Sequence, residues 1–129
     1  MPNTLYPSAI GALSDAHKRF TPELHAAFQT FSQKVFAEGA LETKTKQLIA
    51  VAVAHVTQCP YCIRGHTKAA MREGATREEL MEAIWVAAEM RAGAAYTHSV
   101  LALDEMENAA AVSVSDQAAV LAVSRTQSD

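Results

Sequence analysis

Three residues have types and a spacing that could do chemistry: Cys59, Cys62 and His66. The chain has two cysteines, which lie three residues apart at the predicted start of a helix, and the histidine follows one turn later on the same face. A helix N-terminus carries unpaired N–H groups and a partial positive charge of ~0.5, which favour a thiolate over a thiol. Because the thiolate is the nucleophile and this cysteine spacing allows a disulfide to close, the motif indicates redox cycling.

Metal binding is the first alternative for this motif. A structural zinc site normally takes four ligands, and only His55 or His98 could join His66 and the two cysteines. Nothing in the spacing selects either histidine, so we expect no bound metal. Covalent haem attachment is excluded because Ile63, and not a histidine, follows Cys62. A third alternative, two buried cysteines that merely pack, is disfavoured by the helix start and by the nearby imidazole.

His55 is a further candidate catalytic residue. It interrupts an apolar run one turn before Cys59 and could face that sulfur if the helix continues that far. A buried histidine that hydrogen-bonds a carbonyl is an equally consistent interpretation.

Length and composition bound the class of protein. The 129 residues predict one domain over residues 1–129, and half of them are apolar. Alanine is abundant and aromatic residues are few, so we expect part of the apolar surface to form subunit contacts in a homo-oligomer. The net charge of −3 predicts neither a nucleic-acid partner nor an anionic membrane partner.

The sequence shows no pattern typical of a secretory signal or a membrane span. The first 20 residues lack a charged leader followed by an apolar core. The longest apolar run, residues 48–54, is far shorter than the ~20 residues of a membrane span. We therefore expect a cytoplasmic protein.

The motif must be positioned by helices, because helical periodicity dominates and predicts an all-α fold. Thr21 and Pro22 form an N-cap signal for a helix that Gly39 ends. We expect it to be a core helix, since four large apolar residues share one of its faces: Leu24, Phe28, Phe31 and Val35.

The next two predicted helices meet at the cysteines. One begins at Glu42 or Thr43 and ends near Thr57, and its apolar middle predicts a central position. The other begins at Pro60 and stops at Gly74, so the motif lies at a helix-to-helix junction.

A last helix is predicted to open at Thr76, which forms a capping box with Glu79. We expect it to kink or break around Gly93, with residues 112–129 forming a weak helix and a frayed end. Four of its residues should face inward: Leu80, Ala83, Ile84 and Ala87.

A family resemblance follows from the motif and its flanks. Residues 46–70, which include the run Cys-Pro-Tyr-Cys-Ile-Arg-Gly-His, resemble the core of the carboxymuconolactone decarboxylase and alkylhydroperoxidase D-like superfamily. Residues 74–79 resemble the next segment of that family, and the match covers about residues 41–103.

The resemblance implies an all-helical domain that assembles into trimers or hexamers and, in the cysteine-bearing branch, acts as a thiol peroxidase. It implies that Cys62 attacks the peroxide, that Cys59 resolves the sulfenic acid and that His66 belongs to a proton relay. The decarboxylase branch lacks the cysteine pair, which makes it the weaker match.

One position departs from the family pattern. The peroxidases of the family carry a relay glutamate twelve residues before the first cysteine, where this chain has Gln47. Twelve residues span ~18 Å along one helix, so this position reaches the motif only if the next helix folds back and presents His66. His55, Glu82 or Glu89 could replace the missing carboxylate, and the sequence does not choose among them.

The predicted function is therefore a thiol peroxidase that reduces hydrogen peroxide or small organic hydroperoxides through the Cys59–Cys62 dithiol. No bound cofactor is required, and an external dithiol, a thioredoxin-like or lipoyl protein, supplies the electrons. Two alternatives remain open. One is a decarboxylase-like enzyme acting on a small lactone, and the other is a non-catalytic redox-sensing or zinc-binding oligomer.

Overall fold

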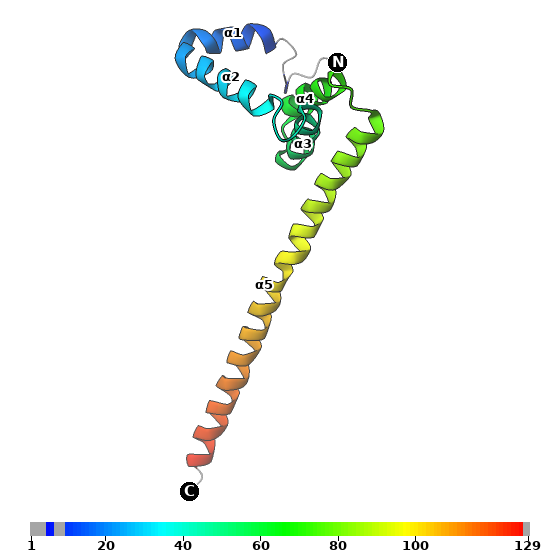
Figure 1. The fold of residues 1–129 in the computed structure, drawn as a ribbon. Coiled ribbons are helices and arrows are strands. Elements are labelled where there is room, and N and C mark those ends of the chain that lie inside the picture. Colours follow the sequence, from blue (N-terminus) through cyan, green and yellow to red (C-terminus); the bar gives the residue numbers. More distant parts are fainter. Residues whose placement is uncertain (1–4, 7–9, 128–129) are drawn as a thin grey trace.

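A computed structural model describes residues 5–6 and 10–127 of the chain (Figure 1). These residues form helices and no strand, which confirms the predicted all-α class. The helices are α1 (Ile10–Phe20), α2 (Pro22–Phe36), α3 (Thr43–Thr57), α4 (Pro60–Arg72) and α5 (Arg77–Thr126).

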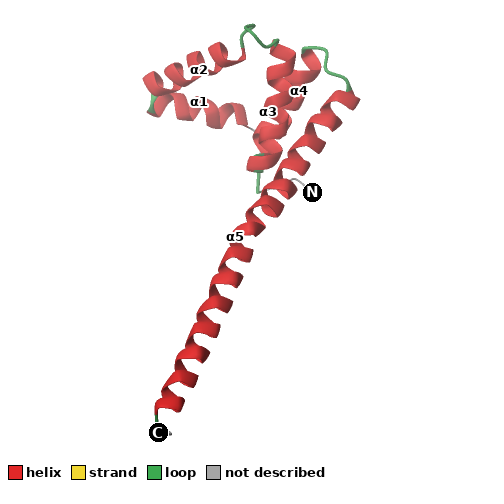
Figure 2. Cartoon of the chain, turned by 60° about the horizontal axis from the view of Figure 1, so that its bottom comes forward, coloured by secondary structure: helices red, strands yellow, loops and turns green. Residues whose placement is uncertain are grey.

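The core lies where α3, α4 and the first turns of α5 pack together, as Figure 2 shows. Val51 of α3 is completely buried and contacts a cluster that includes Ala70, Ala75 and Leu80. Leu48 and Ile84 pack against this cluster. The central position predicted for α3 is confirmed. The small side chains of Ala70 and Ala75 let the neighbouring helices approach α3 closely.

The junction that carries the cysteines is set by backbone geometry. Gln58 adopts a left-handed conformation with φ of 57°, which ends α3. The chain then turns so that the N–H of Cys59 donates to the carbonyl of Ala54 at 3.1 Å, and Pro60 opens α4. Cys59 is consequently the N-cap of α4, as the sequence predicts.

The turn between α4 and α5 forms where the sequence predicts it, but the predicted capping box is only half present. Gly74 has φ of 88°, a conformation that glycine adopts easily, and Thr76 Oγ1 accepts a hydrogen bond from the N–H of Glu79 at 3.1 Å. The Glu79 carboxylate does not complete the predicted capping box, because it pairs with Lys44 Nζ of α3 at 2.9 Å. The hydrogen bond from Lys44 lowers the pKa of Glu79.

The break predicted around Gly93 is wrong, because α5 is one helix of 50 residues. A glycine costs ~1 kcal/mol relative to alanine in a helix, but it keeps its N–H and so cannot interrupt the hydrogen-bond ladder by itself. The weak C-terminal helix is likewise a regular continuation as far as Thr126, and residues 128–129 of the expected frayed end lie outside the described residues. The second half of α5 extends away from the other helices (Figure 1).

The expectation that α2 is a core helix is wrong for the single chain. None of its residues is buried, and Leu24 and Phe28 of its apolar face are 71% and 68% exposed. The helix pairs with α1, which the sequence analysis did not predict, and touches α3 over a few residues. The apolar face of α2 is therefore mostly exposed in the single chain.

A large total surface accompanies these exposed faces. The chain exposes 10,462 Å², whereas a compact chain of 13.8 kDa is expected to expose about 6,600 Å².

Within the described part of the chain, no helix combines the length and the apolar character that crossing a membrane requires.

Candidate active site

The two cysteines meet at the start of α4 without forming a disulfide. The sulfur of Cys59 accepts a hydrogen bond from the backbone N–H of Cys62 at 3.3 Å. Both side chains are half-buried. The first sulfur thus occupies the position of an N-cap oxygen, where the free N–H groups of the helix favour a negative charge.

The hydrogen bonding separates the two thiols electrostatically. A hydrogen bond from the side chain of Cys62 lowers the pKa of Cys59, and the hydrogen bond from the backbone N–H of Cys62 lowers it further. The same side-chain hydrogen bond raises the pKa of Cys62, and burial together with the charge on Cys59 raises it further. The expectation that the helix start favours a thiolate does not hold for Cys62, because the side chain of Cys59 and burial outweigh the lowering effect of the backbone N–H there.

His66 is held by a residue from another helix. Its Nδ1 lies 2.8 Å from Oε1 of Gln47 on α3. Because an amide oxygen only accepts, Nδ1–H is the donor and the neutral ring keeps Nε2 as a proton acceptor. Gln47 is 8% exposed, so this hydrogen bond is partly buried. The expectation that this position reaches the motif through His66 is confirmed.

Phe36, at the C-terminal end of α2, also fixes the imidazole. The two rings stack with centroids 5.1 Å apart and planes inclined by 27°. This contact leaves little freedom for rotation of His66. Phe36 could not be predicted as a site residue, because no spacing signal connects the end of α2 with a histidine on α4.

These side chains surround an open cavity of about 470 Å³. Cys62 and His66 both line it, whereas Cys59 does not. The other lining residues come from α2, α3 and α4: Ser32, Gln33, Phe36, Gln47, Tyr61, Gly65 and Ala69. The second cysteine is thus the sulfur that a small molecule in this cavity would meet.

The other candidate relay residues lie elsewhere. His55 directs Nδ1 to the carbonyl of Val51 at 2.7 Å, within its own helix, and does not line the cavity. Glu82 and Glu89 are exposed on α5, which contributes no residue to the cavity. Among the described residues, no group of three or more His, Cys, Asp or Glu side chains could hold a metal ion.

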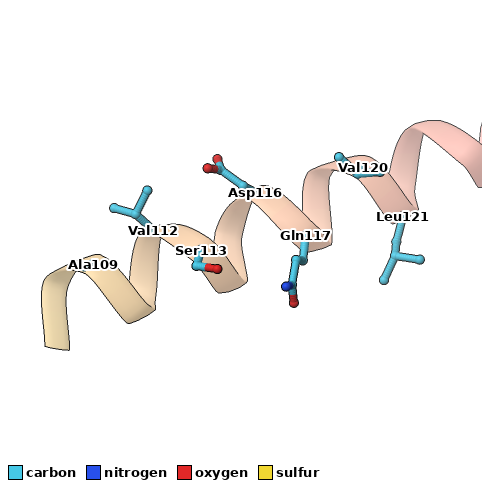
Figure 3. Close-up of a pocket in the computed structure, with 7 residues that line it drawn as sticks. All are labelled: Ala109, Val112, Ser113, Asp116, Gln117, Val120 and Leu121. Atoms are coloured by element: carbon cyan, nitrogen blue, oxygen red, sulfur yellow. The ribbon is translucent and has the colours of Figure 1, made fainter. Parts of the chain in front are cut away.

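A second, open pocket of about 650 Å³ lies along one face of the outer half of α5 (Figure 3). It contains no cysteine or histidine, and it is lined by Ala109, Val112, Ser113, Asp116, Gln117, Val120 and Leu121. Figure 3 shows these residues on successive turns of one helix. Its residue types suit a contact with another surface better than a chemical step.

The family is shown by comparison with known proteins. Residues 22–105 match the model of the carboxymuconolactone decarboxylase family, and the chain belongs to this family. The match runs from the start of α2 into the middle of α5 and so includes every residue that lines the cavity.

Relatives extend this result. The chain is 59% identical over 106 residues to a protein of Paracoccus denitrificans named uncharacterized protein 4 in cox locus, which covers 80% of this chain and 95% of that protein. A carboxymuconolactone decarboxylase family protein from Legionella pneumophila, solved in its apo form, is 40% identical with a TM-score of 0.60, over 63% of this chain and 72% of that one. A structure from Methanobacterium thermoautotrophicum is 38% identical with the same TM-score of 0.60, and the match covers 63% of this chain and 91% of that one.

Proposed function

We propose that this protein is a thiol peroxidase that reduces hydrogen peroxide or small organic hydroperoxides. The observation that carries the proposal is the shared cavity of Cys62 and His66, with the sulfur of Cys59 hydrogen-bonded to the backbone of Cys62. A nucleophile, a base and a second thiol are thereby held within the first two turns of α4 and its N-cap.

The first step is attack by Cys62. His66 Nε2 accepts the thiol proton, and the sulfur attacks one oxygen of the hydroperoxide. An S–O bond forms as the O–O bond breaks, and the leaving oxygen takes the proton and departs as an alcohol or as water. Cys62 is left as a sulfenic acid.

The second step is resolution by Cys59. Its lowered pKa provides a thiolate that attacks the sulfenic sulfur, forming the disulfide and releasing hydroxide, which is protonated to water. The two thiols have then given two electrons to the peroxide. An external dithiol, either a thioredoxin-like protein or a lipoyl group, must return them.

The lactone alternative has less support from this geometry. Among the residues that the structure describes, no carboxylate lines the cavity, and its titratable lining consists of Tyr61, Cys62 and His66. An acid-base enzyme on this fold would keep its activity when both cysteines are replaced.

Intact mass spectrometry before and after a peroxide pulse tests the proposal. The reduced protein is expected to lose about 2 Da as the disulfide forms, and to regain them with a dithiol. It is also expected to carry no zinc when purified without a chelator. Thiols that do not react with peroxide, or zinc that is released only on denaturation, would contradict the proposal.

We further propose that the protein acts as a homo-oligomer, a trimer or hexamer. The exposed area exceeds that of a compact chain by about 3,900 Å², and a stable interface needs only about 800 Å² from each partner. The exposed apolar faces of α2 and of the outer half of α5 are the surfaces that other copies would cover.

Light scattering after gel filtration checks this oligomer. The wild-type mass is expected to be three or six times 13.8 kDa. Phe28→Glu places a charge on the exposed apolar face of α2 and should shift the protein to smaller species, because an unpaired charge is costly to bury. Gln29→Glu adds the same charge to a neighbouring exposed position and serves as the control. A monomeric wild-type protein would refute the proposal.

A further inference from the structure

Gly65 lies in the wall of the active-site cavity, on α4 between Cys62 and His66. Side chains three and four residues apart share a helix face, so a side chain at this position would stand beside the sulfur. A Cβ added to Gly65 would meet no atom within 4 Å. The space above this residue is therefore open cavity.

The backbone does not explain this glycine. Gly74 has φ of 88°, which requires a glycine-like residue, and a Cβ at Gly93 would come within 3.2 Å of Glu89 Oε1. Gly65 meets neither condition and lies inside a helix, where glycine is less favourable than every residue except proline. A reason beyond folding is needed for the missing side chain.

We propose that Gly65 sets the size of the substituent with which a hydroperoxide can reach Cys62. The cavity of about 470 Å³ is far larger than hydrogen peroxide needs. Across the same cavity, α2 contributes Ser32, Gln33 and Phe36, so a large side chain on α4 would narrow the space between the two helices. This role rests on the proposed peroxidase function and assigns to one residue the selection among its substrates.

Kinetics with two peroxides test the role. Gly65→Leu is expected to lower kcat/KM for cumene hydroperoxide by roughly 10-fold or more relative to that for hydrogen peroxide, since a pocket discriminates by about this factor per methylene. Gly65→Ala should have a smaller effect and should raise the melting temperature by a few degrees.

Gly11→Leu is the matched control. Gly11 is also a helical glycine with no atom within 4 Å of an added Cβ, but it lies on α1 and does not line this cavity. Its replacement should leave the ratio of the two kcat/KM values unchanged. An equal loss for both peroxides in Gly65→Leu would show that the residue does not select by size.

Alkylation provides a readout that does not depend on peroxidase activity. In a Cys59→Ser background, only Cys62 reacts, and its rate with N-phenylmaleimide is compared with its rate with iodoacetamide. Gly65→Leu should reduce this ratio by roughly 10-fold. A wild-type protein that reduces no peroxide would refute the proposed function, while the alkylation ratio would still decide the role of Gly65. An unchanged ratio would refute that role.

Discussion

Cys62→Ser is expected to lower peroxide consumption by roughly 1,000-fold or more, because it removes the sulfur that lines the cavity beside His66. Cys59→Ser is expected to retain the attack step and to accumulate a sulfenic acid on Cys62, since the resolving thiol is gone. Peroxide consumption and trapping with a dimedone-type probe, followed by peptide mass spectrometry, check both outcomes.

The two single variants control for each other, because serine can keep the N-cap hydrogen bond and both proteins retain one thiol. The lowered pKa of Cys59 gives the opposite order a physical basis, since the first thiolate of the pair forms there. A sulfenic acid trapped at Cys59 in the Cys62→Ser variant would exchange the two roles.

The Cys59→Ser variant also tests the coupling of the two thiols. The hydrogen bond with Cys59 and the charge on that residue raise the pKa of Cys62. Cys59→Ser removes the thiolate, so the pH dependence of Cys62 alkylation should move to lower pH. A midpoint that does not move would show that burial alone raises this pKa.

Local sequence signals predicted much of the site. The bounds of α3, the N-cap position of Cys59 and the turn at Gly74 depend on neighbouring residues and on backbone preferences, and they are as expected. The contact between Gln47 and His66 meets the condition that the sequence set, because the helix after the cysteines folds back along α3.

Features that depend on distant contacts could not be predicted in this way. No pattern indicates that the end of α2 places Phe36 against His66, or that Ser32 and Gln33 line the cavity. The apolar face of α2 indicates that burial is needed but not whether its own chain supplies the partner. For α5, a single glycine signal was outweighed by the good helix formers around it.

Gln47→Glu is expected to increase the peroxidase rate at pH 7 and to move its pH profile to lower pH. In the wild-type protein the amide fixes the tautomer of His66 but carries no charge to stabilise an imidazolium. A carboxylate at this position would raise the pKa of His66, and the protonated ring would lower that of Cys62. The rate should rise ~10-fold for each unit by which the thiol pKa falls, until ionisation saturates or weaker nucleophilicity offsets it.

Gln33→Glu is the matched control for this variant. It places the same charge in the same cavity, but on α2 and without the hydrogen bond to His66 that the structure gives Gln47. Stopped-flow rates between pH 5 and 9 should move with Gln47→Glu and much less with the control. Thermal unfolding is measured alongside, because a charge at a site that is 8% exposed destabilises the fold unless His66 pairs with it.

The pattern of the two profiles decides the mechanism. A shift in Gln47→Glu alone would mean that charge reaches the sulfur through the imidazole, so that the wild-type amide keeps Cys62 largely protonated at neutral pH. Equal shifts of the pH profile in both variants would mean that any negative charge in the cavity changes the rate, whether or not it contacts His66. Unchanged profiles would remove Gln47 from proton transfer and leave it the task of holding the ring.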